Sequence, residues 1–180
     1  NLLINNDNGV ILNGSATVAT ADVEATNGVI HEINEVLNRP SLVGVASNNS
    51  DFSTLVEAVV KAELVDALSA AGPYTVLAPT NAAFEQLFTD LQVSGIADLT
   101  KEQLQPILLY HVLNGNLREM DVVDAITGGT TNLPTLNTMA NIDLAIVDGG
   151  VVVNGESNIV ATNVQGVNGV VHVINKVLVP

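Results

Sequence analysis

The chain contains no cysteine, so disulfide bonds, thiol catalysis and thiolate metal sites are all excluded. It has only five lysines and arginines against 19 acidic residues, which leaves a net charge of −14. Phosphate backbones are repelled by such a surface, so nucleic-acid binding is excluded, and adsorption to anionic membranes is disfavoured for the same reason. No apolar run reaches the length of a membrane span, which argues against direct membrane insertion of this segment.

Aromatic residues are scarce, at 3% of the chain, so any core must be built from Val, Leu, Ile and Ala. Those residues are plentiful, because the hydrophobic fraction is 47% while only 13% of residues are charged. This composition predicts a folded protein and not a disordered one. The length of 180 residues suits one domain of ordinary size with an appendage.

The most informative feature that is present is an internal repeat. Residues 9–37 and residues 150–178 match without a gap, at a spacing of 141 positions. A repeat of that length corresponds to a whole domain. We therefore predict the C-terminal segment of a preceding domain plus a linker over residues 1–40, and a complete domain over residues 41–180. The recurring residues include Asn27, Gly28, His31 and Asn34, which return as Asn168, Gly169, His172 and Asn175.

The first part of the chain has the pattern of short strands. Residues 10–12, 17–19 and 29–37 are rich in β-branched side chains, and Asn-Gly pairs at 8–9, 13–14 and 27–28 separate them. Asn-Gly tolerates positive φ at both centres of a type I′ turn, so these pairs predict hairpins. The later copy repeats such pairs at 154–155 and 168–169, and these predict hairpins as well.

The middle of the chain has a helical period. Apolar residues from Phe52 to Leu68 predict one helix that stops before Gly72-Pro73, with Ser50 or Asp51 as its cap. Residues 74–77 predict a buried strand, and Thr80 or Asn81 predicts the start of a short helix.

Two further helices are predicted, and the first of them is expected to be interrupted. Thr100 and Gln103 have capping-box spacing, and Pro106 is expected to break the helix that they open. That helix is expected to resume and to stop at Asn114-Gly115. Residues 119–126 predict one more helix, and strands follow after Gly129. Helices in the middle and strands at the end predict an α+β fold with a largely antiparallel sheet.

Three ordered segments resemble the signature motifs of fasciclin-type domains. Residues 74–84 (YTVLAPTNAAF) resemble the first motif, residues 109–112 (LYHV) the central Tyr-His motif, and residues 170–178 (VVHVINKVL) the second signature motif. The motif residues expected to have structural roles are Thr75, Pro79, Thr80, Asn81, Phe84, His172 and Asn175.

This resemblance implies a wedge-shaped antiparallel β-sandwich flanked by a group of short helices. It also implies a protein that is secreted or anchored at the cell surface, in which such domains often occur in tandem and serve adhesion. The missing cysteines and plain loops favour a bacterial member. Glu63 departs from the family pattern, since it stands where a glycine is common, and no Arg-Gly-Asp tripeptide supports integrin binding.

Two residues are the candidates for partner binding. The family links the Tyr-His motif to partner recognition, which makes Tyr110 and His111 tentative partner-binding residues; the alternative is a buried, hydrogen-bonded pair. His31 and His172 occupy the same place in the two copies, so a structural polar anchor inside a strand is favoured for both over a metal ligand.

No catalytic residue, metal site or cofactor is predicted. Gly-x-Ser-x-Gly and phosphate-loop sequences are absent. Asp143, Asp148 and Glu156 lie near a glycine turn, but they lack the dense spacing of a calcium loop, so solvated turn carboxylates are favoured.

The sequence thus predicts a non-enzymatic extracellular adhesion module that contacts a protein or glycan on a cell surface or matrix. The alternative is a carbohydrate or plant-cell-wall binding module of a larger secreted protein, although the few aromatic residues mostly have the pattern of core residues. A second hypothesis concerns residues 1–37, whose uncovered strands predict a homo-oligomer through strand exchange or packing.

Overall fold

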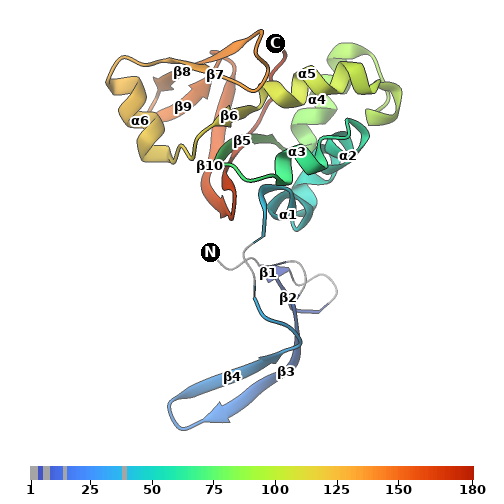
Figure 1. The fold of residues 1–180 in the computed structure, drawn as a ribbon, viewed down its shortest axis with the longest axis vertical. Coiled ribbons are helices and arrows are strands. Elements are labelled where there is room, and N and C mark those ends of the chain that lie inside the picture. The colour runs from blue at the N-terminus through green and yellow to red at the C-terminus, as the bar shows by residue number, and fades with distance from the viewer. Residues whose placement is uncertain (1–3, 6–8, 14–15, 38–39) are drawn as a thin grey trace.

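The computed structural model describes residues 4–5, 9–13, 16–37 and 40–180. Within that part, a body of helices and strands is formed by the chain from Pro40 onward, and a separate group of N-terminal strands projects from it (Figure 1). The N-terminal strands are β1 (Ile4–Asn5), β2 (Ile11–Leu12), β3 (Ala16–Ala25) and β4 (Gly28–Ile33), paired in that order.

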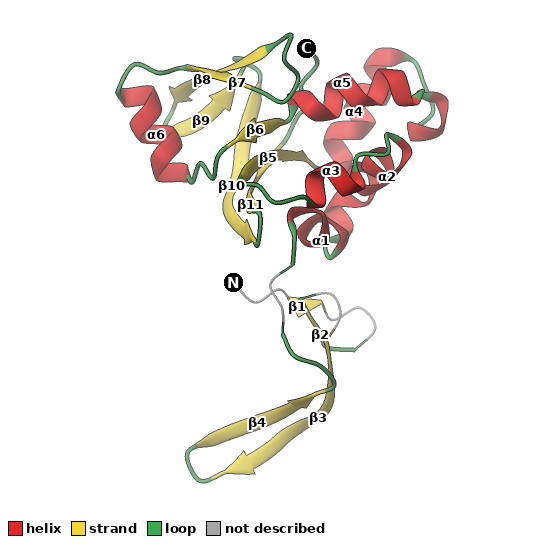
Figure 2. Ribbon diagram, in the orientation of Figure 1, coloured by secondary structure: helices red, strands yellow, loops and turns green. Residues whose placement is uncertain are grey.

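The helices of the body come before most of its strands, as Figure 2 shows. They are α1 (Leu42–Ser47), α2 (Ser53–Lys61), α3 (Val65–Ser69), α4 (Asn81–Leu91), α5 (Lys101–Tyr110) and α6 (Glu119–Thr127), with 3-10 turns at Ser50–Phe52 and Ile96–Asp98. Helices α1 to α5 gather on one side of the body, and α6 lies on the opposite side (Figure 1).

The strands of the body form one seven-stranded sheet in the order β6-β5-β11-β10-β9-β8-β7. Their bounds are β5 Tyr74–Pro79, β6 Val112–Asn114, β7 Asn132–Pro134, β8 Asn141–Val147, β9 Gly150–Val153, β10 Ser157–Gly166 and β11 Gly169–Ile174. All neighbours pair antiparallel except β5 and β11, which run parallel. The predicted α+β class with a largely antiparallel sheet is confirmed.

The two edges of this sheet meet. Leu113 of β6 forms an antiparallel bridge with Thr135, and the amide of Leu136 donates to the carbonyl of Val112 at 2.7 Å. The two layers expected of a sandwich are therefore joined into a nearly closed sheet. One apolar core, which includes Phe84 and Leu104, lies among the helices, and a second, which includes Ile142 and Ile174, lies among the strands and α6.

The long helix predicted from Phe52 to Leu68 is wrong, because it is broken into α2 and α3. Glu63 lies at the break with φ 56°, a left-handed conformation that cannot continue a right-handed helix. This explains why the family favours glycine there. The predicted caps Ser50 and Asp51 do not serve that role, since the side chains of Asn49 and Asn81 accept the amides of Asp51 and Thr54.

Helix α5 differs from expectation at both of its predicted interruptions. The Thr100–Gln103 capping box opens it as predicted, but the helix runs through Pro106 without a break. Proline has no amide hydrogen, so the carbonyl of Glu102 lacks its helical hydrogen bond. Glu102 and Pro106 are both exposed, and water can therefore satisfy that carbonyl. The helix ends at Tyr110, and Val112–Asn114 is a strand because it pairs with β5.

The Asn-Gly turns are partly confirmed. Asn154 and Gly155 have φ 53° and 70°, as a type I′ turn requires. In the β3–β4 and β10–β11 hairpins the two-residue loop lies one residue before the predicted Asn-Gly pair. Ala25 pairs with Gly28 and Gly166 with Gly169, so both glycines are strand residues. Asn8 and Gly14, which belong to two further predicted turns, lie outside the described residues, as do residues 38–39 of the predicted linker.

Candidate interaction surface

Tyr110 lies at the end of α5 and its side chain points into the body. The ring is 5% exposed. Its hydroxyl donates to the carbonyl of Asn141 at 2.9 Å and accepts a hydrogen bond from the side-chain amide of Asn154 at 2.9 Å. Tyr110 therefore connects α5 to the start of β8 and to the turn after β9.

His111, the next residue, is 2% exposed and uses both ring nitrogens. Nδ1 lies 2.8 Å from the carbonyl of Ile107, and Nε2 accepts the amide of Leu178 at 2.9 Å. Since a carbonyl can only accept, Nδ1 carries the proton and the ring is neutral. Burial lowers the pKa of His111 to about 4, because the charged ring would lose its hydration. The ring ties α5 to the C-terminal residues.

A partner could touch neither ring without the domain opening, because both side chains are buried. Direct contact through Tyr110 and His111 is therefore not what their positions favour. Any contribution of the motif to partner binding would pass through the loops that Tyr110 holds. The prediction that the two residues take part in partner binding stays a prediction.

The residues of the first motif fasten β5 and α4 to their neighbours. Thr75 is fully buried, and its hydroxyl donates to the carbonyl of Gly115 and accepts the amide of Leu117. Thr80 caps α4 by accepting the amide of Ala83.

Three further motif residues complete these attachments. The side chain of Asn81 accepts the amide of Thr54 at the start of α2 and donates to the carbonyl of Ser50. Pro79 ends β5 opposite Ile174, and Phe84 is a buried core ring.

The residues of the second motif are also inside the body. His172 is 1% exposed, and its Nε2 donates to the carbonyl of Leu117 at 2.8 Å. Burial lowers the pKa of His172 below its usual value. The side chain of Asn175 accepts the amide of Asn158 at 2.8 Å, which holds the ends of β10 and β11 together.

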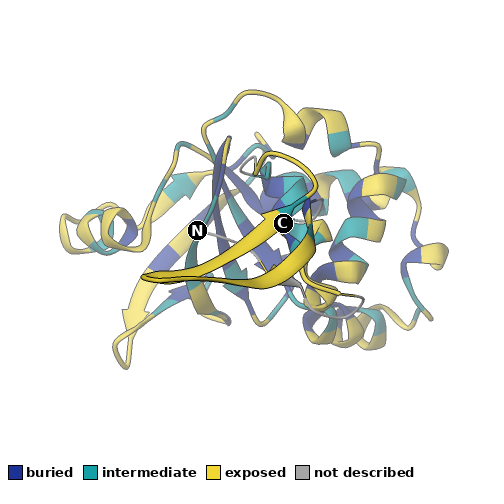
Figure 3. Ribbon diagram, turned by 90° about the horizontal axis from the view of Figure 1, so that it is seen from below, coloured by how far each residue is buried: buried dark blue, intermediate teal, exposed yellow. Residues whose placement is uncertain are grey.

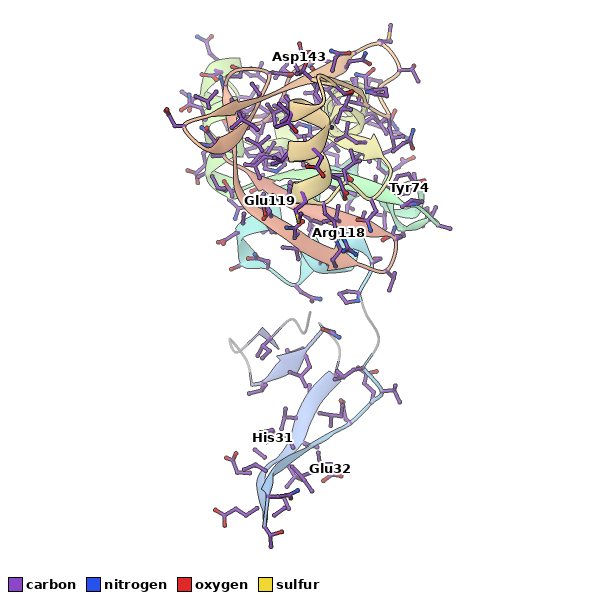
Figure 4. All side chains as sticks on the ribbon, turned by 90° about the vertical axis from the view of Figure 1, so that its left-hand side faces the viewer. His31, Glu32, Tyr74, Arg118, Glu119 and Asp143 are labelled. Carbon is purple, nitrogen blue, oxygen red and sulfur yellow. The ribbon has the colours of Figure 1, made fainter. Side chains whose placement is uncertain are left out.

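The first copy of the repeat has the same hairpin in a different environment. His31, the counterpart of His172, is exposed, and its Nδ1 accepts the amide of Asp22 at 3.2 Å. In Figure 3 the β3–β4 hairpin is coloured as exposed almost throughout, and Figure 4 shows His31 and Glu32 on it, away from the body. His31 lies inside a strand, as expected, but it is exposed because no described element covers β4.

Two asparagines of the repeat were not singled out from the sequence as contact residues. The side chain of Asn168 accepts the amide of Leu42 at 2.9 Å and donates to the carbonyls of Leu68 and Ala70. It thereby ties the β10–β11 turn to α1 and α3. Asn27 is its exposed counterpart. The recurrence of Asn-Gly at both places was the available signal, but it indicated a turn, not this set of contacts.

The charged residues are dispersed over the body. Asp143 accepts from the side chain of Asn132, and Glu156 pairs with Lys176. Among the described residues, no group of three His, Asp or Glu side chains could hold a metal ion. In that same part of the chain, no helix has the length and apolarity needed to cross a bilayer.

Comparison with known proteins identifies the family. Residues 1–39 and 50–180 match the family described as Fasciclin domain. Protein sll1483 of Synechocystis sp. is 37% identical over 171 residues, which cover 93% of this chain and 89% of that protein. A second protein of that organism, sll1735, is 33% identical over 141 residues, which cover 77% of this chain and 97% of that protein.

Longer relatives match over nearly the whole chain as well. Transforming growth factor-beta-induced protein ig-h3 of Oryctolagus cuniculus is 29% identical over 175 residues, and the chain spans 24% of its length. Among solved structures, the fasciclin domain pair of the insect cell adhesion molecule Fasciclin I overlays 100% of this chain with a TM-score of 0.69 at 22% identity, and the chain covers 66% of it. The chain belongs to the fasciclin domain family.

Proposed function

We propose that this protein is a non-enzymatic adhesion module that acts outside the cell and contacts a protein or a glycan on a cell surface or matrix. The observation that carries the proposal is the family match over residues 1–39 and 50–180, together with the fold of a named cell adhesion molecule. The strongly acidic surface favours partners other than nucleic acids and anionic lipids.

The burial of two of the three histidines supports a non-enzymatic role. A general base or nucleophile activator needs a ring nitrogen that is free to reach a substrate. In His111 both ring nitrogens are bonded to backbone groups, and in His172 the Nε2 nitrogen is bonded to a carbonyl inside the core. These rings hold segments of the fold together.

For the domain organisation, we propose that residues 1–40 are the C-terminal segment of a preceding fasciclin domain plus a linker, and that residues 41–180 are a complete domain. Two observations support this division. The repeat spacing is 141 positions, and the relative sll1735 is matched over 97% of its length by an alignment of 141 residues.

An adhesion assay tests the proposal. The folded chain would be immobilised, and the attachment of cells or the binding of matrix proteins would be compared with that of the heat-unfolded chain. We expect attachment to the folded chain alone. Equal attachment to both surfaces would contradict a specific adhesion site.

The role of the Tyr-His motif is tested in the same assay with Tyr110→Phe. This change keeps the ring but removes the hydroxyl that holds Asn141 and Asn154. We expect weaker attachment because the loops at those residues would lose their anchor. Tyr74→Phe, which also removes one hydroxyl from a ring in the body, is the matched control. Unchanged attachment of Tyr110→Phe would remove the motif from the binding site.

The alternative of a carbohydrate or plant-cell-wall binding module is less well supported. Sugar sites usually offer an exposed aromatic face, whereas every aromatic ring here is buried or half-buried. The five rings are those of Phe52, Tyr74, Phe84, Phe88 and Tyr110. Specific binding on a glycan array would favour this alternative.

A further inference from the structure

The hairpin β3–β4 has the backbone of β10–β11. The bounds of both strands and all five paired positions of the first hairpin recur in the second, 141 residues later. The pair Val18↔Ile33 corresponds to Ile159↔Ile174, and the pair Ala25↔Gly28 corresponds to Gly166↔Gly169. Both hairpins contain the same register shifts. Asp22 and Asn163, within those shifts, have φ values of 58° and 63°.

The side-chain bond that closes each hairpin is also the same. The amide of Thr17 donates to the side chain of Asn34 at 2.7 Å, and the amide of Asn158 donates to that of Asn175 at 2.8 Å. The first hairpin is therefore already in the conformation that the second has inside the folded body.

The two hairpins differ in what lies beside them. Strand β11 pairs with β10 and also, in parallel, with β5, through six residue pairs from Gly169↔Tyr74 to Ile174↔Pro79. Among the described strands, β4 pairs only with β3. Its other edge has free backbone groups, which is the arrangement that recruits a further strand.

Because no strand lies beside β4 as β5 lies beside β11, apolar side chains of β4 are exposed. Val170 and Val171 are 0% and 2% exposed in the body, whereas their counterparts Val29 and Ile30 are 54% and 59% exposed. Exposed apolar surface next to a free strand edge favours association.

Gly28 indicates that the missing neighbour is a backbone. A Cβ at its counterpart Gly169 would lie 1.9 Å from the carbonyl oxygen of Tyr74, so only glycine allows β5 to pass there. A Cβ at Gly28 would meet nothing within 4 Å. Nothing in the free chain therefore requires glycine at this position. A strand that packed against β4 as β5 packs against β11 would require it.

Asn27 and His31 indicate which kind of protein supplies that backbone. Their counterparts make contacts that only a fasciclin body provides: Asn168 bonds to three backbone groups of α1 and the α3 region, and His172 to the carbonyl of Leu117. A generic strand would leave both side chains without these partners.

We propose that the free edge of β4 docks a parallel strand of a second fasciclin body, one that lacks its own terminal hairpin. The register is the one in which β11 pairs with β5. Gly28 then lies opposite the counterpart of Tyr74, and Ile33 lies opposite the counterpart of Pro79. This inference rests on the domain division proposed above and does not depend on the adhesion function.

Exchange between two complete copies of this chain does not satisfy the edge. Each copy has one body and two such hairpins, so exchanging hairpins leaves the same number uncovered and adds no strand pairing. The alternative partner for the free edge of β4 is the same edge of a second copy. That pairing would join two hairpins and leave both bodies unchanged.

A tandem protein tests the proposal. Residues 41–141 would be placed directly before Asn1 of the unchanged chain, so that the added body has the repeat spacing but no hairpin of its own. We expect hydrogen exchange of the amides of residues 28–33 to slow by at least about tenfold relative to the 180-residue chain, because docking protects them. Unchanged exchange at residues 28–33 would overturn the proposal.

The matched control carries residues 142–178 in place of residues 1–37, which makes the added unit identical to the second domain. It shows how a completed first domain behaves with the same junction. A first domain that folds in this control, but not with residues 1–37, would also overturn the proposal.

Substitution of the glycines separates docking from folding. We expect Gly28→Ala to leave the stability of the 180-residue chain unchanged and to abolish the protection of residues 28–33 in the tandem protein. Gly169→Ala should unfold the body in both proteins, since its Cβ meets the Tyr74 carbonyl. Protection that survives Gly28→Ala would contradict the proposed register.

The mass of the 180-residue chain in solution tests the alternative partner. We expect a monomer in sedimentation experiments over the concentration range used for hydrogen exchange. A stable dimer that disappears on deletion of residues 1–40 would show that a second copy covers β4, and this result would overturn the proposal.

Discussion

At the scale of single residues, several buried polar side chains of the body hold together two segments that are distant in the sequence. His111 joins the end of α5 to Leu178, 67 positions later, and Asn168 reaches α1 over 126 positions. A buried polar group without a partner costs about 1–3 kcal/mol, so each of these side chains specifies one arrangement of its neighbours.

The pH dependence of stability provides a test of His111. The unfolded chain takes up a proton on this ring near pH 6.5, while the folded ring stays neutral down to about pH 4. Because the unfolded state binds more protons in this window, the contribution of His111 to stability is lost as the pH falls from about 6.5 to 4. Between pH 7 and pH 4.5 we expect a loss of about 2 kcal/mol from this residue.

Urea unfolding of the parent chain and of His111→Gln at both pH values measures this loss. Glutamine does not titrate, so the variant should be less stable at pH 7 but should lose less stability on acidification. His172 titrates in both proteins and cancels in the comparison. Equal losses in the two proteins would show that His111 is not the titrating group.

Thr75→Val tests the buried hydroxyl of the first motif. The change preserves the shape of the side chain but leaves the Gly115 carbonyl and the Leu117 amide without their partner. We expect a destabilisation of about 1–3 kcal/mol by chemical unfolding. Thr89→Val, at an exposed helix position, is the control and should change stability by less than about 0.5 kcal/mol.

At the scale of elements, the break between α2 and α3 depends on one residue in a left-handed conformation. Glu63 has φ 56°, which is unfavourable for a side chain with a Cβ, and its carboxylate forms only an exposed ion pair with Lys101. Since Glu63→Gly and Glu63→Ala both remove the ion pair, comparison between them isolates the backbone term.

We expect Glu63→Gly to be more stable than Glu63→Ala by about 1 kcal/mol, as measured by urea unfolding. The parent chain should lie near the alanine variant. Equal stability of the two variants would mean that the left-handed conformation carries no cost at this break.

Caps, apolar period and β-branched runs allowed α4, β5, α6 and the last strands to be predicted from local signals. Thr80, Thr100 and the Asn154-Gly155 pair act as the sequence indicates, because caps and tight turns depend on residues a few positions away. Strand β6 was predicted as helix because its conformation is set by pairing with β5, some 40 residues earlier.

At the scale of the whole molecule, the net charge is −14 and few of the carboxylates form ion pairs. Of the described residues, Lys101 and Lys176 are the only lysines or arginines that pair with a carboxylate, and both pairs are exposed. Repulsion among the carboxylates should therefore outweigh the attraction in these pairs. We expect the Tm to rise as NaCl is raised from 10 to 150 mM, because the screening length falls from about 30 to 8 Å.

Calorimetric scans over that salt range measure the effect, and sucrose at the same osmolarity is the control for non-ionic effects. A Tm that falls with added salt would show that attractive charge pairs dominate. The same scans on the chain without residues 1–40 would show how much of the repulsion comes from the N-terminal strands.

The partner prediction for Tyr110 and His111 illustrates the limit of a motif. The sequence identified two polar aromatic side chains side by side, but both could be placed inside or outside until the packing of α5 against β8, β9 and the C-terminal residues was known. Burial of both rings leaves a partner only the surrounding loops to contact.

The sequence by itself determined the family, the α+β class, the duplication and most local elements, because these depend on spacing, caps and apolar period along the chain. The tertiary structure alone decided that His172 is buried and His31 exposed, although both occupy the same place in one repeated hairpin. The physical reason is that burial depends on what packs against a strand from elsewhere in the chain. Strand β5 and the segment at Leu117 cover β11, and no described part of the chain covers β4.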